Sequence, residues 1–180
     1  MLTFATTNED KVAEARAHLR DVVDVEQYDY DYLEIQSDDL AEIAARGARE
    51  AFDARDGDDP VIVDDTGFYV RALGGFPGPY AAYVERTLGV ERLWTVASSL
   101  DDTRASFRCV VAYADADGVE TFEGAVQGTL VAPRGEGGFG YDPIFEYDGQ
   151  TFAELSTDEK NAFSHRARAL SKLAEWLAED

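Results

Sequence analysis

Residues 61–67 read VIVDDTG, three β-branched apolar residues followed at once by two carboxylates. β-Branched residues are favoured in strands, and an unbroken apolar run is typical of a strand that is buried on both faces, as in a parallel sheet. The segment therefore predicts a buried strand over Val61–Val63 that ends at Asp64 and Asp65. Ligands of open α/β sheets bind at the carboxyl ends of such strands, which makes the two aspartates candidate site residues.

The carboxylate pair also has a purely structural interpretation, in which Asp64 and Asp65 form a turn and a helix cap. Two adjacent carboxylates at a sheet end are costly unless a cation or a proton offsets their charge, and this cost favours a functional role. Because neighbouring residues of a strand point to opposite faces, we expect only one of the two to be a direct metal ligand.

Strands and helices alternate around this segment. Strands are predicted at Leu2–Thr6, Val22–Tyr28, Ala105–Ala114, Glu120–Val131 and Ile144–Tyr147. Helices are predicted from Asn8, as N-cap, to Leu19, over Leu40–Arg55, in one or two pieces between Pro79 and Leu100, and at the end of the chain. A turn at Asp56–Pro60 ends the second helix, and Asp115–Gly118 predicts a hairpin. The pattern predicts an α/β fold with a mixed sheet flanked by helices, in a single domain over residues 1–180.

The composition is strongly acidic. Asp and Glu total 37 against 16 for Lys and Arg, giving a formal net charge of -21, while 45% of the residues are hydrophobic. So many apolar residues indicate a folded protein and not a disordered acidic tail. The negative field repels nucleic acids and anionic membranes, so a small anion binds only where local cations or a metal outweigh that field. An acid excess with few lysines resembles proteins of salt-rich cytoplasms, where ions screen the repulsion.

Cys109 is the only cysteine, so an intramolecular disulfide is excluded. No apolar stretch is long enough to span a membrane, and the first residues lack the pattern of a signal peptide. The sequence therefore predicts a soluble, cytoplasmic protein that has neither nucleic acid nor membrane as a partner.

Only three lysines stand in the chain, and two of them lie in segments with other anion-binding features. Lys11 closes residues 6–11, TTNEDK, at a predicted strand-to-helix corner. Backbone N–H groups and the positive end of the helix dipole face outward at such a corner, and an ammonium adds charge, so the segment is a candidate phosphate cradle. It lacks the glycines of a Walker loop, and an ordinary capped helix start is the alternative.

The second of these lysines, Lys160, follows a capping box at Ser156–Glu159, which predicts one helical turn. A new helix with Ser164 as its N-cap would place His165 and Arg166 together in a first turn, where both could face a ligand. The alternative is an unbroken helix that points them in different directions, and we favour the restart.

A glycine-rich loop at residues 135–138 precedes Phe139-Gly140-Tyr141-Asp142-Pro143. Glycines let a ligand approach the backbone closely, and Phe139 offers a flat face on which a base can stack. The alternative is a flexible loop without a ligand.

Together these segments resemble the inosine triphosphate pyrophosphatase family, whose members hydrolyse non-standard purine nucleoside triphosphates such as ITP, dITP and XTP to the monophosphate and pyrophosphate. The likeness covers nearly the whole chain, in the same order, through Thr7-Asn8-x-x-Lys11, Glu34, Asp64-Asp65-Thr66-Gly67, Leu73-Gly74-Gly75-x-Pro77-Gly78-x-Tyr80, Gly138-Phe139-Gly140-Tyr141-Asp142-Pro143 and Glu159-Lys160-Asn161-x-x-Ser164-His165-Arg166. The resemblance implies a long, twisted, mixed sheet flanked by helices, two lobes around a central cleft, a homodimer and a requirement for Mg²⁺.

The resemblance also implies a role for each matching residue. Asp65 accepts the proton of the attacking water and, with Glu34, holds Mg²⁺; by pattern alone Glu34 would be one solvated acid among many. Lys11 and Lys160 balance phosphate charge. The full set of implied substrate contacts is Thr6, Thr7, Asn8, Glu9, Asp10, Lys11, Thr66, Phe139, Gly140, Tyr141, Asp142, Lys160, His165 and Arg166.

Base selectivity follows from the same resemblance. Phe139 stacks on the purine, and His165 and Arg166 donate to its 6-oxo group, an acceptor that hypoxanthine and xanthine carry and adenine lacks. A site that presents donors there rejects adenine's amino group, because donor would meet donor.

One departure from the family pattern stands on the second helix. Many members have a lysine where this chain has Gly47, so one cation is missing unless Arg46 or Arg49 replaces it.

Two other functions are kept open. One is a Maf-type nucleotide pyrophosphatase with a different base preference, and the other is a non-enzymatic acidic protein that binds nucleotides or metals.

Overall fold

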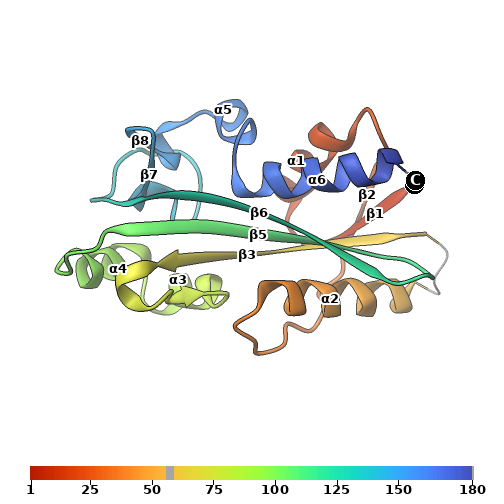
Figure 1. Ribbon diagram of the computed structural model, residues 1–180, viewed down its shortest axis with the longest axis horizontal. Coiled ribbons are helices and arrows are strands. Elements are labelled where there is room, and N and C mark those ends of the chain that lie inside the picture. The colour runs from red at the N-terminus through yellow and green to blue at the C-terminus, as the bar shows by residue number, and fades with distance from the viewer. Residues whose placement is uncertain (56–58, 180) are drawn as a thin grey trace. The chain divides into compact units, whose positions relative to one another are not determined.

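The computed structural model describes residues 1–55 and 59–179 (Figure 1). Its internal contacts divide the chain into two compact units. The first unit comprises Met1–Asp65, Cys109–Gly124 and His165–Asp180, and the second comprises Thr66–Arg108 and Ala125–Ser164. Of the turn predicted at Asp56–Pro60, residues 56–58 lie outside the described residues.

The strands form one mixed sheet, which confirms the predicted fold class. Its order is β2 (Val25–Tyr28), β1 (Leu2–Ala5), β3 (Val61–Val70), β5 (Arg104–Ala114), β6 (Val119–Leu130), β7 (Phe145–Tyr147) and β8 (Gln150–Thr151), and β4 (Pro77–Gly78) pairs with β3. Strand β1 runs parallel to both β2 and β3. Strands β7 and β8, by contrast, are antiparallel to their partners in the second unit.

Strand β3 corrects the prediction for the segment at residues 61–67. The strand does not end at the two aspartates but continues to Val70, so both carboxylates lie within it. The apolar alternation resumes at Phe68 and Val70, which are fully buried. Gly67 does not break the strand, because the ring of Tyr69 fills the place of the missing side chain: a Cβ at residue 67 would lie 2.7 Å from Tyr69 Cε2.

Three helices pack on the sheet in the first unit. They are α1 (Glu9–Leu19), α2 (Leu40–Ala54) and α6 (His165–Glu179), with α1 and α6 on one side of the sheet and α2 on the other (Figure 1). Apolar residues of α1 and α6, such as Val12 and Leu170, share a core with Phe4 of β1 and Ile62 of β3. Strand β2 is shorter than predicted at its start, because the N–H groups of Val22 and Val23 instead bond to the carbonyl of Leu19 and extend the end of α1.

The second unit is built around an aromatic core. Phe68, Phe107, Phe145 and Phe152 contact one another through ring centroids 4.8 to 5.9 Å apart. Short helical elements surround them: η1 (Arg71–Leu73), α3 (Ala81–Thr87), α4 (Val90–Ala97), η2 (Asp142–Ile144), η3 (Phe152–Glu154) and α5 (Thr157–Asn161).

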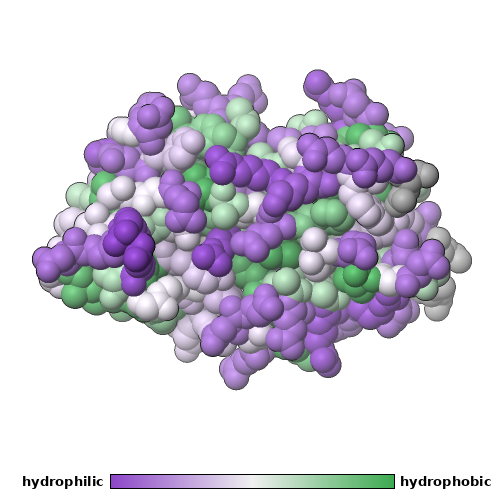
Figure 2. All heavy atoms as spheres, in the orientation of Figure 1, coloured by the Kyte–Doolittle hydropathy of each residue, from purple (hydrophilic) through white to green (hydrophobic). Residues whose placement is uncertain are grey.

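Hydrophilic side chains are spread over the face seen in Figure 2, with apolar residues exposed among them. Among the described residues, no helix combines the length and the apolar character needed to cross a membrane.

Candidate active site

Asp64 is the centre of a buried charge network in the first unit. Its side chain, 1% exposed, lies on β3 and faces cations from two helices. Lys11 of α1 places Nζ 2.6 Å from Oδ1, and Arg166 of α6 donates its Nε–H to Oδ2 at 2.6 Å. The strand and the two helices thereby meet at one carboxylate.

Arg166 contacts a second carboxylate. Its Nη1 donates to Oε2 of Glu14 on α1 at 2.7 Å, and both side chains are buried. Lys11 and Arg166 thus balance Asp64 and Glu14, two positive charges against two negative ones. Removing charges from water is costly unless they are paired with opposite charges. Each charge of this network has such a partner, although Asp64 Oδ1 forms only an ion pair with Lys11 and no hydrogen bond to any described residue.

The network keeps its members ionised. Burial by itself raises the pKa of Asp64, but the charges of Lys11 and Arg166 outweigh burial and hold the pKa well below its usual range. Burial likewise lowers the pKa of Arg166, and the neighbouring charges of Asp64 and Glu14 more than reverse that effect. Asp64 is therefore a permanently charged anchor and not a group that exchanges protons near neutral pH.

The corner at residues 6–11 is a capped helix start. Asn8 Oδ1 accepts the backbone N–H groups of Asp10 at 2.9 Å and Lys11 at 3.3 Å, and Asn8's own N–H donates to Thr6 Oγ1. The ordinary capped helix start, which was the alternative to a phosphate cradle, is therefore present. Thr7, Glu9 and Asp10 are exposed beside the cap, and the side chain of Lys11 keeps 22% of its surface accessible. The polar side chains of this corner, more than its N–H groups, are what a phosphate would meet.

Tyr32 brings the two predicted metal ligands into the same neighbourhood. Its hydroxyl donates to the backbone carbonyl of Asp64 at 3.3 Å. Burial raises the pKa of that hydroxyl first, and the nearby charges of Asp64, Asp65 and Glu34 raise it further. Asp65 is half-buried and Glu34 is exposed, so both are less enclosed than Asp64.

Two carboxylates of this kind fit Mg²⁺. The ion usually binds one or two protein carboxylates and completes its shell with water and substrate phosphates. Within residues 1–55 and 59–179, no group of three or more His, Cys, Asp and Glu side chains is arranged to hold a metal without further ligands. Asp65 and Glu34 can therefore supply part of a coordination shell that a polyphosphate would complete.

The ring of Tyr32 leaves no space for a lysine side chain at residue 47. A Cβ at residue 47 would lie 2.5 Å from Tyr32 Cδ2, so the ring of Tyr32 occupies the space of the missing side chain. Arg49 does not replace the absent lysine, since its guanidinium donates to the carbonyls of Asp115 and Gly118 at 2.9 and 2.6 Å. Arg46, the other candidate, is exposed.

The second unit holds the predicted base-stacking loop. Asp142 Oδ2 accepts Nζ of Lys160 at 2.6 Å and the N–H of Phe139 at 3.0 Å, and Asp142 and Lys160 are both buried. The ammonium of Lys160 lies 4.5 Å from the centroid of the Phe139 ring, which is itself half exposed. Tyr141 is a core residue, because its ring stacks on Phe68 and its hydroxyl donates to the carbonyl of Ala81.

The helical break near the end of the chain is confirmed. Ser156 and Glu159 form the predicted capping box of α5, and a new helix, α6, begins at His165. The two residues predicted to face a ligand together, His165 and Arg166, are both buried in the first turn of that helix. Arg166 is held by its two carboxylates, as described above.

The predicted site residues fall into two groups. The first unit holds Thr6, Thr7, Asn8, Glu9, Asp10, Lys11, Glu34, Asp65, His165 and Arg166, and the second holds Thr66, Phe139, Gly140, Tyr141, Asp142 and Lys160. Sequence reasoning missed Glu14 and Tyr32 and did not foresee that Asp64 binds two cations. Glu14 gave no signal among 37 acids.

Comparisons with known proteins identify the family of the chain. Residues 2–176 match the model of the Ham1 family. The dITP/XTP pyrophosphatase of Methanopyrus kandleri is 48% identical over 178 residues, covering 96% of this chain and 94% of that protein. The inosine triphosphate pyrophosphatase of Emericella nidulans is 41% identical over 181 residues, covering 99% and 97%. The solved structure of a HAM1 protein from Coxiella burnetii superposes with a TM-score of 0.88 at 30% identity, covering 99% of this chain and 98% of that one. The chain belongs to the Ham1 family.

Proposed function

We propose that this protein is a nucleoside triphosphate pyrophosphatase that hydrolyses the non-standard purine nucleotides ITP, dITP and XTP to a monophosphate and pyrophosphate, with Mg²⁺ as its cofactor. The observation that carries the proposal is the similarity to proteins named dITP/XTP pyrophosphatase or inosine triphosphate pyrophosphatase, 41 to 48% identical over at least 96% of the chain. The arrangement of charged groups around Asp64 supports a site for a highly charged substrate.

Asp65 is the proposed proton acceptor. Asp64, its neighbour on β3, is committed to Lys11 and Arg166, whereas Asp65 is less enclosed and points to the other face of the strand. In the proposed step water gives its proton to the Asp65 carboxylate and its oxygen to phosphorus, and the bond between the α- and β-phosphates breaks. Mg²⁺ bound by Asp65 and Glu34 would offset the negative charge of the phosphate oxygens.

Lys11 and the corner at residues 6–11 form the proposed phosphate end. An ammonium has three N–H donors, and the ion pair of Lys11 with Asp64 leaves donors for a substrate. Asp64 therefore acts as a positioning residue that fixes Lys11 in place before the substrate arrives. The side chains of Thr7 and Asn8 can add neutral donors beside it.

Phe139 and its neighbours form the proposed base end. The half-exposed ring can stack on a purine, and the contacts of Lys160 with Asp142 and with this ring favour a place for Lys160 near the base, although the sequence interpretation grouped it with the phosphate. Two of the five donors of the Arg166 guanidinium go to Asp64 and Glu14. We propose that its remaining donors, with His165, bind the 6-oxo group.

A pyrophosphate-release assay tests the proposal. We expect Mg²⁺-dependent release of pyrophosphate from ITP, dITP and XTP, little from ATP or GTP, and loss of activity with EDTA. Orthophosphate together with a nucleoside diphosphate as products would refute it, and a preference for pyrimidine nucleotides would favour the Maf-type alternative.

We also propose that the protein is a homodimer and that it works in a salt-rich cytoplasm. Sedimentation would test the first of these proposals, and activity across a salt series would test the second.

A further inference from the structure

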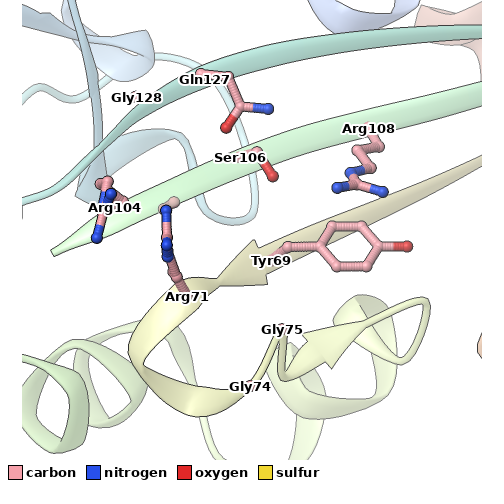
Figure 3. Close-up of a pocket in the computed structure, with 10 residues that line it drawn as sticks. Tyr69, Arg71, Gly74, Gly75, Arg104, Ser106, Arg108, Gln127 and Gly128 are labelled. Atoms are coloured by element: carbon pink, nitrogen blue, oxygen red, sulfur yellow. The ribbon is translucent and has the colours of Figure 1, made fainter. Parts of the chain in front are cut away.

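A second group of cations lies outside all of these motifs. A cavity of about 390 Å³ in the second unit is lined by polar residues that include Tyr69, Arg71, Arg104, Ser106, Arg108 and Gln127 (Figure 3). Its volume falls within the range of small-molecule sites, roughly 300–1,000 Å³. None of its lining residues, all of them in the described part of the chain, is acidic.

The strand alternation explains why these side chains gather. Along β5, Arg104, Ser106 and Arg108 point to one face of the sheet, while Ala105 and Phe107 between them are buried in the aromatic core on the other. Tyr69 at the end of β3 and Arg71 just after it reach the same cavity from the neighbouring strand. In Figure 3, Arg71 and Arg104 lie at one end, Arg108 and Tyr69 at the other, and the Ser106 hydroxyl between them.

One carboxylate only partly neutralises these cations. Asp102 accepts Nε and Nη2 of Arg104 at 2.8 and 2.7 Å and lies 3.4 Å from Arg71 Nε. The hydrogen bonds from Arg104 lower the pKa of Asp102 to about 2, so this single negative charge is permanent. Arg108 lies over the ring of Tyr69, 4.8 Å from its centroid, and forms no ion pair with a carboxylate of residues 1–55 or 59–179.

Three guanidinium groups against one carboxylate leave two positive charges at this cavity, in a chain whose formal charge is -21. Arg134, by contrast, forms ion pairs with two carboxylates, Glu146 and Glu154. A guanidinium presents a planar fork of donors that matches the oxygens of a phosphate, and Ser106 and Gln127 add neutral donors.

We propose that this cavity binds a phosphate-type oxyanion with at least two negative charges, such as inorganic pyrophosphate. A doubly charged anion would neutralise the local excess, and the cavity has room for a diphosphate. The inference rests on the second unit alone and does not depend on the proposed reaction.

Isothermal titration calorimetry with pyrophosphate tests the site, on the full chain, at constant salt and with EDTA to remove metal-dependent binding. Arg108→Gln removes one guanidinium fork from an exposed position and should weaken binding at least about tenfold. Sulfate should compete with pyrophosphate, and chloride should not.

Arg86→Gln is the matched control, because Arg86 of α3 belongs to the same unit and also lies over a tyrosine, 6.0 Å from the ring centroid of Tyr83. Its affinity should stay within about twofold of the unaltered protein, since Arg86 does not line the cavity. A third variant, Lys11→Met, removes the ammonium of the proposed phosphate end and should also bind pyrophosphate normally. Equal weakening in Arg108→Gln and Arg86→Gln, loss of binding only in Lys11→Met, or no saturable binding at all would each overturn the proposal.

Discussion

Arg166 and Asp64, 102 residues apart in the chain, form a buried ion pair with 2.6 Å between Nε and Oδ2. The pair ties the first turn of α6 to the middle of β3, and the second contact of Arg166, with Glu14, ties both to α1. Each buried charge has its partner, so the whole arrangement is favourable only when it is complete.

Asp64→Asn should therefore destabilise the fold strongly. The substitution keeps the shape of the side chain but leaves Lys11 and Arg166 without the charge that both face, and breaking a buried pair in this way costs about 3–5 kcal/mol. Urea unfolding measures the change. Asp102→Asn, which breaks a largely exposed pair with Arg104, is the matched control and should cost no more than about 1 kcal/mol. A loss of similar size in both variants would contradict the role given to the network.

The stability that Asp64→Asn loses should depend on pH. The pKa of Asp64 is depressed in the folded state, so its stabilising contribution is complete above the usual value of 3.8 and is lost as the pH falls below it towards the folded pKa. The difference in unfolding free energy between the unaltered protein and Asp64→Asn should stay constant from about pH 7 to pH 5 and shrink by about pH 3. A gap that stays the same or widens in acid would show that Asp64 is not the titrating group.

Gly47→Ala tests the packing of Tyr32. In an ordinary helix interior this change stabilises by roughly 0.5–1 kcal/mol, whereas here the new Cβ would lie 2.5 Å from the Tyr32 ring and should cost about 1–3 kcal/mol instead. The experiment therefore measures whether the free energy of unfolding rises or falls. Gly118→Ala is the control, because a Cβ there meets open space, and it should alter stability by less than about 0.5 kcal/mol. Stabilisation by Gly47→Ala would show that Tyr32 moves aside at little cost.

The sequence predicted features that depend on residues close together in the chain, and it failed where distant residues interact. The capping box at Ser156–Glu159 and the helix start at His165 are local, and both are confirmed. The predicted end of β3 was wrong because the apolar run stops at the two aspartates, and the packing of the Tyr69 ring over Gly67 can be seen only once the strand is formed.

The pairing within the site could not be predicted either. Nothing in the sequence distinguishes Glu14 from the other acids, and the contact of Asp64 with Arg166 depends on how a strand and a distant helix are packed. The motifs predicted a set of site residues, but the partners of Lys11 and Lys160, an aspartate in each case, are known only from the fold.

Asp65→Asn should separate catalysis from stability. The substitution removes the proposed proton acceptor and a metal-binding charge together, so turnover of ITP should fall by at least about two orders of magnitude. The free energy of unfolding should change little, since Asp65 is less enclosed than Asp64. Asp64→Asn, in contrast, should lose stability as well as activity. Near-native turnover in Asp65→Asn together with loss in a folded Asp64→Asn protein would reverse the assignment of the two aspartates.

The variants Lys160→Met and Lys11→Met test which lysine acts on the base of the nucleotide and which acts on its phosphates. Both substitutions replace an ammonium by an apolar chain of similar length. Asp64 keeps Arg166 when Lys11 is lost, whereas Asp142 loses the ion pair with Lys160, so the structural cost should be larger for Lys160→Met. If Lys160 acts beside Phe139, its loss should reduce kcat/KM for ITP about 10- to 100-fold more than for ATP, as expected for a charge-assisted hydrogen bond worth about 1.5–3 kcal/mol. Lys11→Met should weaken both nucleotides alike, because phosphates carry no base information. The ratio of the two specificity constants is independent of the fraction of folded enzyme. A ratio that collapses in Lys11→Met and is unchanged in Lys160→Met would return Lys160 to the phosphates and place Lys11 at the base.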